Sequence, residues 1–193
     1  MFESAASPRI PSELMEQPRW YALRTRARAE KKTHALLEKA GVESFPAVGE
    51  VERSWADRTR RVAMPLFPGY IFVRIPLRET KAVLRWPGAV DLVRNGGTPT
   101  PVRGEEMDAV VRLARGVTET GALPADADPV LDAGPGDRVR VTTGPFEGLV
   151  GVLVETRGAE HVVVRLDALR QAKAVRVARE ALEDEDAGRR RAR

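Results

Sequence analysis

The sequence predicts an α+β protein of two domains: an antiparallel sheet backed by helices, followed by a small β-barrel. Three observations lead to this prediction. Short apolar strands alternate with amphipathic helices up to residue 115, which is typical of a sheet with helices packed on it. From residue 134 onward only short strands remain, and glycine turns divide them. Between the two, residues 116–133 carry acids, prolines and glycines without a clear period, which indicates a linker.

The composition is that of a chain that can bury a core but has few reactive side chains. Of its 193 residues, 42% are hydrophobic and only 5% are aromatic. The net charge is +4 while the pI is about 9.8, so the distribution of charge matters more than its sum. Cysteine is absent, and the two histidines, His34 and His161, lie far apart in the sequence. We therefore expect no disulfide and no metal site.

The motifs of several function classes are also missing. The chain has no Gly-x-Ser-x-Gly elbow, no Walker loop and no dinucleotide fingerprint, so neither an enzyme nor a cofactor is predicted. No apolar run is long enough to cross a membrane, and the start Met1-Phe2-Glu3 lacks the pattern of a signal peptide. We expect a cytoplasmic protein without membrane contact.

The first elements are a mobile leader over residues 1–18, a strand over 20–24 and a helix over 28–40. Apolar residues recur at helical spacing until Gly41 ends the helix. Arg28, Lys32 and Lys39 fall along one stripe of it, because steps of four and seven residues nearly close whole turns. Such a stripe either follows a nucleic-acid backbone or is a solvated face, and the residues alone leave both readings open.

A strand over 42–45 is followed by a polar hairpin over 50–62. Trp55 lies there among arginines that include Arg58. A tryptophan in such surroundings stacks on a base or enters a groove, or else it packs on arginine stems as a small cluster. Both interpretations remain open at this point.

A proline-framed turn, Pro65-Leu66-Phe67-Pro68-Gly69-Tyr70, opens the central strand over 70–75. The prolines restrict φ, and Gly69 permits the sharp entry that the strand needs. The turn holds Leu66, Phe67 and Tyr70 as a rigid apolar knob at the end of the sheet, or else Phe67 caps the core.

The first domain, residues 19–115, ends with a short helix, a strand and a longer helix. Residues 78–85 form the short helix, residues 90–93 the strand, and residues 95–97 a turn. The last helix opens at residue 103 or 104, with Glu105 and Glu106 in its first turn, where the helix dipole favours acids.

The second domain, residues 134–183, is predicted as an SH3-like barrel. Its strands are expected over 138–142, 149–155, 161–166 and 174–177. The tail over 184–193 changes from acidic to basic and is predicted to be disordered.

Two separate motifs resemble the NusG family of transcription factors. The first is residues 65–73, together with Trp20-Tyr21 at the first strand. The second is Gly136-Asp137-Arg138-Val139-Arg140-Val141 with Gly144-Pro145-Phe146-Glu147-Gly148, which resembles the KOW motif. The resemblance covers roughly residues 17–183. It implies an NGN domain followed by a KOW domain, and a factor that promotes elongation or antitermination.

The resemblance also implies contact surfaces. In this family the first domain docks on the clamp helices of the largest subunit of RNA polymerase, and specialised relatives such as RfaH also contact the non-template DNA strand and the β subunit. The residues assigned in this way are Pro65, Leu66, Phe67, Pro68 and Tyr70 for the clamp helices, Arg26, Lys32 and Lys39 for DNA, and Thr80 and Lys81 for the β subunit. Arg28, Trp55 and Arg58 join the nucleic-acid group from the residue patterns described above.

The KOW loop sets this chain apart from the general factor. Where the family has Ile-Phe-Gly-Arg to meet ribosomal protein S10 or Rho, this chain has Ala168-Leu169-Arg170-Gln171. Leu169 and Arg170 would then be the contact residues, and the missing aromatic argues against Rho. The chain is more similar to RfaH and UpxY-type paralogues, so we expect a monomeric, specialised antiterminator. The alternatives are a housekeeping NusG coupled to Rho or the ribosome, and a ribosome-associated RNA-binding protein with a KOW motif.

Overall fold

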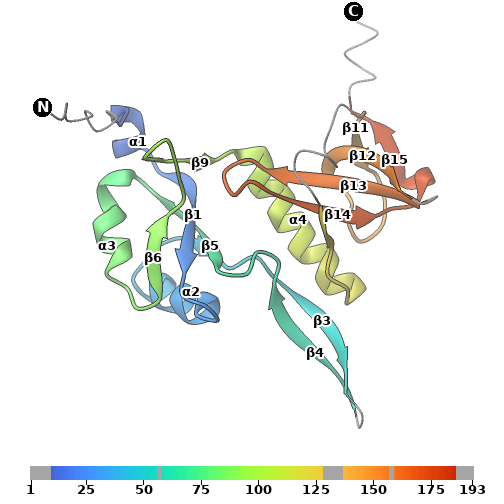
Figure 1. Ribbon diagram of the computed structural model, residues 1–193, viewed down its shortest axis with the longest axis horizontal. Coiled ribbons are helices and arrows are strands. Elements are labelled where there is room, and N and C mark those ends of the chain that lie inside the picture. The colour runs from blue at the N-terminus through green and yellow to red at the C-terminus, as the bar shows by residue number, and fades with distance from the viewer. Residues whose placement is uncertain (1–9, 56–57, 128–136, 157–158, 186–193) are drawn as a thin grey trace, which may run out of the picture. The chain divides into compact units, whose positions relative to one another are not determined.

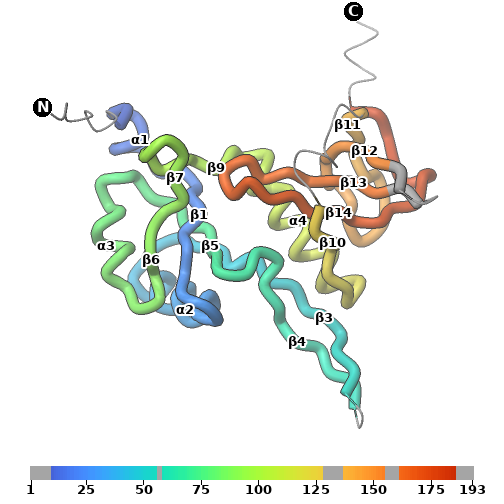
Figure 2. The backbone as a smooth tube through the Cα atoms, in the orientation of Figure 1, coloured from blue at the N-terminus to red at the C-terminus, as the bar shows by residue number. Residues whose placement is uncertain are grey.

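The computed structural model describes residues 10–55, 58–127, 137–156 and 159–185. Two compact units make up the chain: Met1–Pro46 with Phe67–Val102, and Ala47–Leu66 with Arg103–Arg193 (Figures 1 and 2). These units are divided differently from the predicted domains, because the polar hairpin and the last helix before residue 115 group with the barrel. None of the helices in the described ranges is long and apolar enough to span a membrane.

The first unit contains an antiparallel sheet, as predicted. Its strand order is β2-β5-β1-β6, and β9 also pairs with β1. The central pair sets Tyr21 opposite Val73 and Leu23 opposite Ile71. The strands are β1 (Arg19–Thr25), β2 (Ser44–Phe45), β5 (Tyr70–Ile75), β6 (Ala89–Leu92) and β9 (Pro101–Val102), and a small hairpin of β7 (Arg94–Asn95) and β8 (Thr98–Pro99) follows β6.

The helices of this unit pack on one face of the sheet. They are α2 (Glu30–Lys39) and α3 (Thr80–Leu84), with a 3-10 turn over Leu77–Glu79 before α3. Leu37 of α2 and Val83 of α3 join side chains from alternate strand positions in one buried cluster, and each such side chain contributes about 1.5–3 kcal/mol. The cluster consists of Tyr21, Leu23, Leu37, Ile71, Val73, Ile75, Leu77, Val83 and Leu92.

Part of the predicted mobile leader is helical. Ser12–Glu16 forms α1, and Leu14 and Met15 pack against the buried cluster of the sheet. Glu13 pairs with Arg19 at 2.5 Å, and Glu16 pairs with Arg78. The sequence did not predict this short helix, because a helix of little more than one turn has too few apolar residues to show a helical period. Residues 1–9 lie outside the described part.

The second unit contains the polar hairpin, the long helix α4 and the barrel. The hairpin is formed by β3 (Val48–Ser54) and β4 (Thr59–Pro65), close to the predicted range. Its base lies on α4 (Gly104–Thr120), and a Cβ on Gly49 would be 2.3 Å from Val117 Cγ1, so only glycine allows this approach.

Helix α4 continues past residue 115, into the segment that we predicted as linker. Gly116 is the first residue of that predicted linker, but a Cβ there would lie 2.3 Å from the ring of Phe146. The glycine therefore makes room for an aromatic side chain from another element. The helix ends instead at Gly121, whose φ is 68°.

The barrel strands form one six-stranded antiparallel sheet with the order β10-β14-β13-β12-β11-β15. Four of them match the predicted strands within a few residues, namely β11 (Arg138–Val141), β12 (Val150–Thr156), β13 (Ala159–Leu166) and β14 (Gln171–Arg176). The other two were not predicted: β10 (Ala125–Ala127) lies in the expected linker, and β15 (Leu182–Asp184) reaches the first residue of the expected tail. Residues 128–133 and 186–193 lie outside the described ranges.

Candidate nucleic-acid and protein interfaces

The proline-framed turn lies at the start of β5 and is closed by a hydrogen bond from the Tyr70 amide to the Phe67 carbonyl, 3.1 Å. Leu66 and Phe67 are fully buried, and the Phe67 ring meets Phe72 edge-on at 6.0 Å between centroids. Pro65 and Tyr70 are half-buried, and Pro68 is exposed. The expected exposed knob is thus limited to part of the turn, because Phe67 packs on its own sheet. Contact with a partner stays a prediction for these five residues.

A buried glutamate fixes the turn, and the sequence interpretation missed it. Glu30, in the first turn of α2, accepts a hydrogen bond of 2.7 Å from the Gly69 amide. The Gly69 carbonyl in turn accepts one from the Thr25 amide at 2.8 Å. Gly69 has a φ of 82°, which favours glycine. A glutamate at a helix start was visible in the sequence, but nothing there shows that it reaches a turn 39 residues away.

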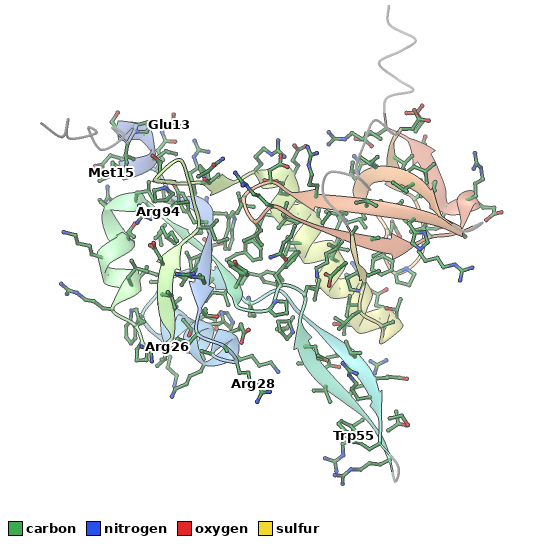
Figure 3. All side chains as sticks on the ribbon, in the orientation of Figure 1. Glu13, Met15, Arg26, Arg28, Trp55 and Arg94 are labelled. Atoms are coloured by element: carbon green, nitrogen blue, oxygen red, sulfur yellow. The ribbon has the colours of Figure 1, made fainter. Side chains whose placement is uncertain are left out.

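The predicted basic stripe is only partly helical. Lys32 and Lys39 are exposed on α2, whereas Arg28 precedes the helix with a φ of 60°. Arg28 is therefore not in the helical register that we assigned to it. Arg26 and Arg28 both lie in the segment that joins β1 to α2 (Figure 3). Within the described ranges, Arg26, Arg28 and Lys32 make no ion pair, so their charge is available to a phosphate backbone.

A second connection holds this basic segment in place. The Arg26 amide donates to the Gly88 carbonyl at 2.9 Å, and Thr33 Oγ1 donates to the Pro87 carbonyl at 3.2 Å. A Cβ on Gly88 would lie 2.2 Å from Thr33 Oγ1, so the loop can approach α2 only with glycine. The loop after α3 thus fixes the position at which Arg26 leaves the sheet.

The hairpin carries its tryptophan near the tip (Figure 3). Trp55 is 50% exposed, and its amide bonds to the Arg58 carbonyl at 2.8 Å. The base of the hairpin is held on α4 by hydrogen bonds from the Glu50 amide to Thr118 Oγ1 and from the Glu52 amide to the Gly121 carbonyl. Half of the indole surface is therefore presented on a β-ribbon with a fixed base.

The turn between β13 and β14 contains Leu169 and Arg170, the two residues predicted to meet a partner. Arg170 is exposed with a φ of 51°, and Leu169 is half-buried. Just before them, the Asp167 amide donates to Glu106 Oε1 at 2.7 Å, and Arg103 reaches the Asp167 carboxylate at 2.7 Å. Helix α4 therefore fixes this turn through its first residues.

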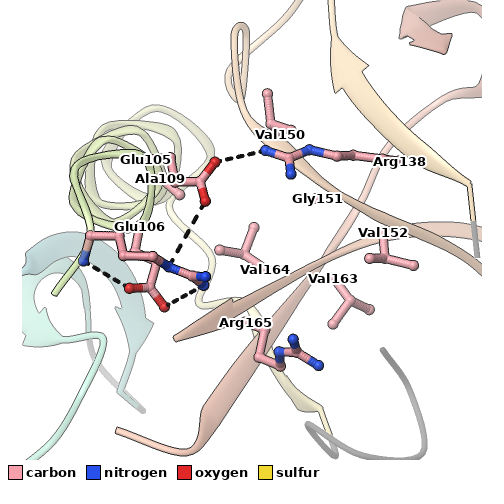
Figure 4. A pocket seen from close by; sticks show the side chains of 11 residues that line it. Glu105, Glu106, Ala109, Arg138, Val150, Gly151, Val152, Val163, Val164 and Arg165 are labelled. Carbon is pink, nitrogen blue, oxygen red and sulfur yellow. Dashed lines mark hydrogen bonds and ion pairs between the residues drawn. The ribbon is translucent and has the colours of Figure 1, made fainter. Parts of the chain in front are cut away.

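Glu106 has a second role at the start of α4. Its Oε2 accepts the Arg103 amide at 2.9 Å in a capping box, and its Oε1 also accepts Arg103 Nη2 at 3.2 Å. This hydrogen bond raises the pKa of the Arg103 guanidinium. The neighbouring Glu105 is exposed and bonds Arg138 of β11 at 2.9 Å, which lowers the pKa of the Glu105 carboxyl (Figure 4). These pairs border a hollow of about 170 Å³ between α4 and the barrel.

Thr80 and Lys81, which were predicted to contact the β subunit, are the first two residues of α3. Thr80 begins this helix and donates its hydroxyl to the Leu77 carbonyl at 2.7 Å, and Lys81 is exposed. Among the described residues there is no cluster of side chains that would hold a metal ion. The exposed cations around α2 and the half-exposed Trp55 are suited to binding a nucleic acid or a protein.

Comparison with known proteins identifies the class to which these units belong. A family model described as transcription termination factor nusG matches residues 18–111, and a model of the KOW motif matches residues 135–165. The transcription termination/antitermination protein NusG of Pseudomonas aeruginosa is 30% identical over 151 residues, which cover 71% of this chain and 81% of that protein. The chain belongs to the NusG family, whose members are transcription factors and not enzymes.

Other relatives differ in length. The NusG protein of Thermus thermophilus is 29% identical over 76% of this chain and 89% of its own. That of Streptomyces virginiae is 32% identical over 70% of this chain, which spans only 52% of that relative. A solved structure described as "Domain interaction in Thermotoga maritima NusG" is 28% identical, covers 88% of this chain and 98% of its own, and has a TM-score of 0.47.

Proposed function

We propose that this NusG-family factor binds the clamp helices of the RNA polymerase largest subunit and promotes processive elongation as a specialised, monomeric, cytoplasmic antiterminator. The observation that carries the proposal is the proline-framed turn. Its backbone is fixed on both sides of Gly69, through Glu30 and Thr25, so little conformational entropy is lost when it docks. The exposed Pro68 and the half-buried Tyr70 form the accessible surface of this turn.

Two further surfaces support contact with the transcription complex. The exposed cations Arg26, Arg28, Lys32 and Lys39 suit the backbone of a non-template DNA strand, and Trp55 with Arg58 suits an unpaired base. Thr80 and Lys81 are proposed to face the β subunit.

The KOW turn supports a specialised role over Rho coupling. Its exposed side chain is an arginine, and Ala168, where the family has an apolar residue before its aromatic, is buried. Without an aromatic anchor the turn lacks the side-chain type that dominates interface energies. Leu169 and Arg170 remain a proposed contact for ribosomal protein S10.

The test is co-precipitation of the full chain with core RNA polymerase. Pro68→Asp combined with Tyr70→Ala is expected to lower the bound fraction about tenfold, because both side chains are at the centre of the proposed contact. Val90→Ala, which trims another exposed apolar side chain of the same unit, is the matched control and should bind like wild type.

Each result decides between the readings. Unchanged binding by the double variant would move the interface elsewhere on the factor. A wild-type protein that retains ribosomal RNA but not polymerase would support the ribosome-associated alternative. Repeating the assay with an elongation complex that carries a non-template strand tests the basic surface, since Lys32→Ala should weaken only that complex.

A further inference from the structure

The hairpin of β3 and β4 has two faces of different chemistry. Residues directly opposite each other in an antiparallel pair lie on the same side of the ribbon, and successive pairs alternate between its two sides. One face therefore carries, from the base of the hairpin outward, the pairs Gly49–Met64, Val51–Val62, Arg53–Arg60 and Trp55–Arg58. We call the outer part of it, formed by Arg53, Trp55, Arg58 and Arg60, the basic face.

The inner part of this face is covered by the protein itself. The Cβ direction of Gly49 points at Val117 of α4, and Val51 is buried. The Glu52 amide bonds the carbonyl of Gly121, where α4 ends. The residues of the basic face follow this last contact, and all of them are exposed. The helix thus covers the apolar half of the ribbon face and leaves the basic half accessible.

The pair Arg53–Arg60 sets two cations directly opposite each other. Like charges in this arrangement destabilise a hairpin. The Arg53 guanidinium donates to the sulfur of Met64 at 3.4 Å, which is a weak acceptor without charge. Within the described ranges, neither Arg53 nor Arg60 forms an ion pair with an acid. An anion from outside the chain would relieve their repulsion.

The opposite face of the hairpin has no such excess of positive charge. Arg61 lies opposite Glu52, and its Nε is 3.7 Å from Glu52 Oε1. The remaining pairs on this side are Val48–Pro65, Glu50–Ala63 and Ser54–Thr59. One cation therefore shares this face with two acids, whereas the described residues of the basic face include three arginines and no acid. Only one side of the ribbon is complementary to a polyanion.

We propose that the basic face binds an unpaired nucleic-acid strand, with a base stacked on Trp55 and the flanking phosphates on Arg53 and Arg60. The inference deepens the contact proposed above for Trp55 and Arg58, and rests on it. The planar guanidinium fork suits phosphate oxygens. A base of an unpaired strand is free to stack on an exposed indole, whereas a duplex must first be partly unstacked.

The test compares two neighbouring arginines on opposite faces. Arg60→Gln and Arg61→Gln remove the same charge from adjacent positions of β4. A labelled oligothymidine of about 12 nucleotides is titrated with the full chain, without polymerase, and followed by fluorescence anisotropy between about 50 and about 200 mM salt. We expect Arg60→Gln to weaken binding about fivefold and to lower the salt slope by about 0.7, while Arg61→Gln binds like wild type. Trp55→Ala should weaken binding about tenfold.

Thermal unfolding separates binding from support of the hairpin. Because Arg60→Gln removes a like-charge contact, its Tm should be no lower than that of wild type. A lower Tm would mean that Arg60 holds the hairpin together, and would overturn the proposal. Equal losses of affinity for Arg60→Gln and Arg61→Gln would do the same, since binding would then follow net charge alone.

The choice of strand and the link to polymerase are tested with the same assay. A wild-type protein that binds no oligonucleotide, or binds a duplex of equal length as tightly, would also overturn the proposal. An oligouridine of the same length distinguishes DNA from RNA as the source of the strand, and a loss on Arg60→Gln with either one supports the basic face. Pro68→Asp with Tyr70→Ala should bind the oligonucleotide like wild type, so that a failure of polymerase docking and a failure of strand binding are told apart.

Discussion

The two turns that we propose as protein contacts are fixed by the same device, and they differ in how much else depends on it. In each, a buried glutamate from the first turn of a helix accepts a hydrogen bond of 2.7 Å from a turn amide: Glu30 from Gly69, and Glu106 from Asp167. Among the described residues, the Glu30 carboxylate accepts this one hydrogen bond, whereas the Glu106 carboxylate also caps its own helix and pairs with Arg103.

Because of this difference, Glu30 mainly positions a turn, whereas Glu106 both positions a turn and stabilises its helix. Removal of Glu30 would release the proline-framed turn while Phe67 stays packed on Phe72. Removal of Glu106 would release the KOW turn and at the same time leave the start of α4 without its cap. The first turn can therefore be loosened alone, and the second cannot.

The largest effect is expected for Glu106→Ala. The change leaves the amides of Arg103 and Asp167 without their acceptor, and we expect a loss of about 3 kcal/mol in the free energy of unfolding. Thermal unfolding and hydrogen exchange of the Asp167 amide measure it. Glu119→Ala, on the exposed face of the same helix, should cost about 0.5 kcal/mol or less.

A smaller effect is expected for Glu30→Ala, which strands a single half-buried amide. The loss should be about 1–2 kcal/mol, and exchange of the Gly69 amide should accelerate while the β1–β5 pairing stays protected. Glu38→Ala, exposed on the same helix, is the control. Equal losses for Glu30→Ala and Glu106→Ala would refute the view that the number of contacts sets the cost.

The elements of this comparison were predicted far better than the contacts between them. The strand Tyr70–Ile75 was predicted to the residue, because its apolar run and its proline-glycine entry are local signals. The turn, the Arg- and Trp-rich hairpin and four barrel strands follow from local patterns in the same way.

What failed in the sequence interpretation depends on distant parts of the chain. Glu106 was explained by the helix dipole alone, because its bond to Asp167 crosses 61 residues. Gly116 was predicted to be the first residue of the linker, since nothing local shows the Phe146 ring for which it makes room. Arg28 was placed on the helix, because its positive φ comes from how the chain joins β1 to α2.

The smallest loss of stability is expected for a substitution of Glu105, the exposed neighbour of Glu106. Glu105 is exposed, and its hydrogen bond with Arg138 lowers the pKa of the carboxyl. A lowered pKa in the folded state adds stability above the unfolded pKa, and this stability is lost as the pH falls below about 5 and the carboxyl becomes protonated. Glu105→Gln should therefore lose about 0.5 kcal/mol or less at pH 7, and nothing further on acidification through this group. Thermal unfolding of both proteins from pH 7 to pH 3 measures the difference, and a gap that does not narrow toward acid would mean that Arg138 does not stabilise the charged carboxylate.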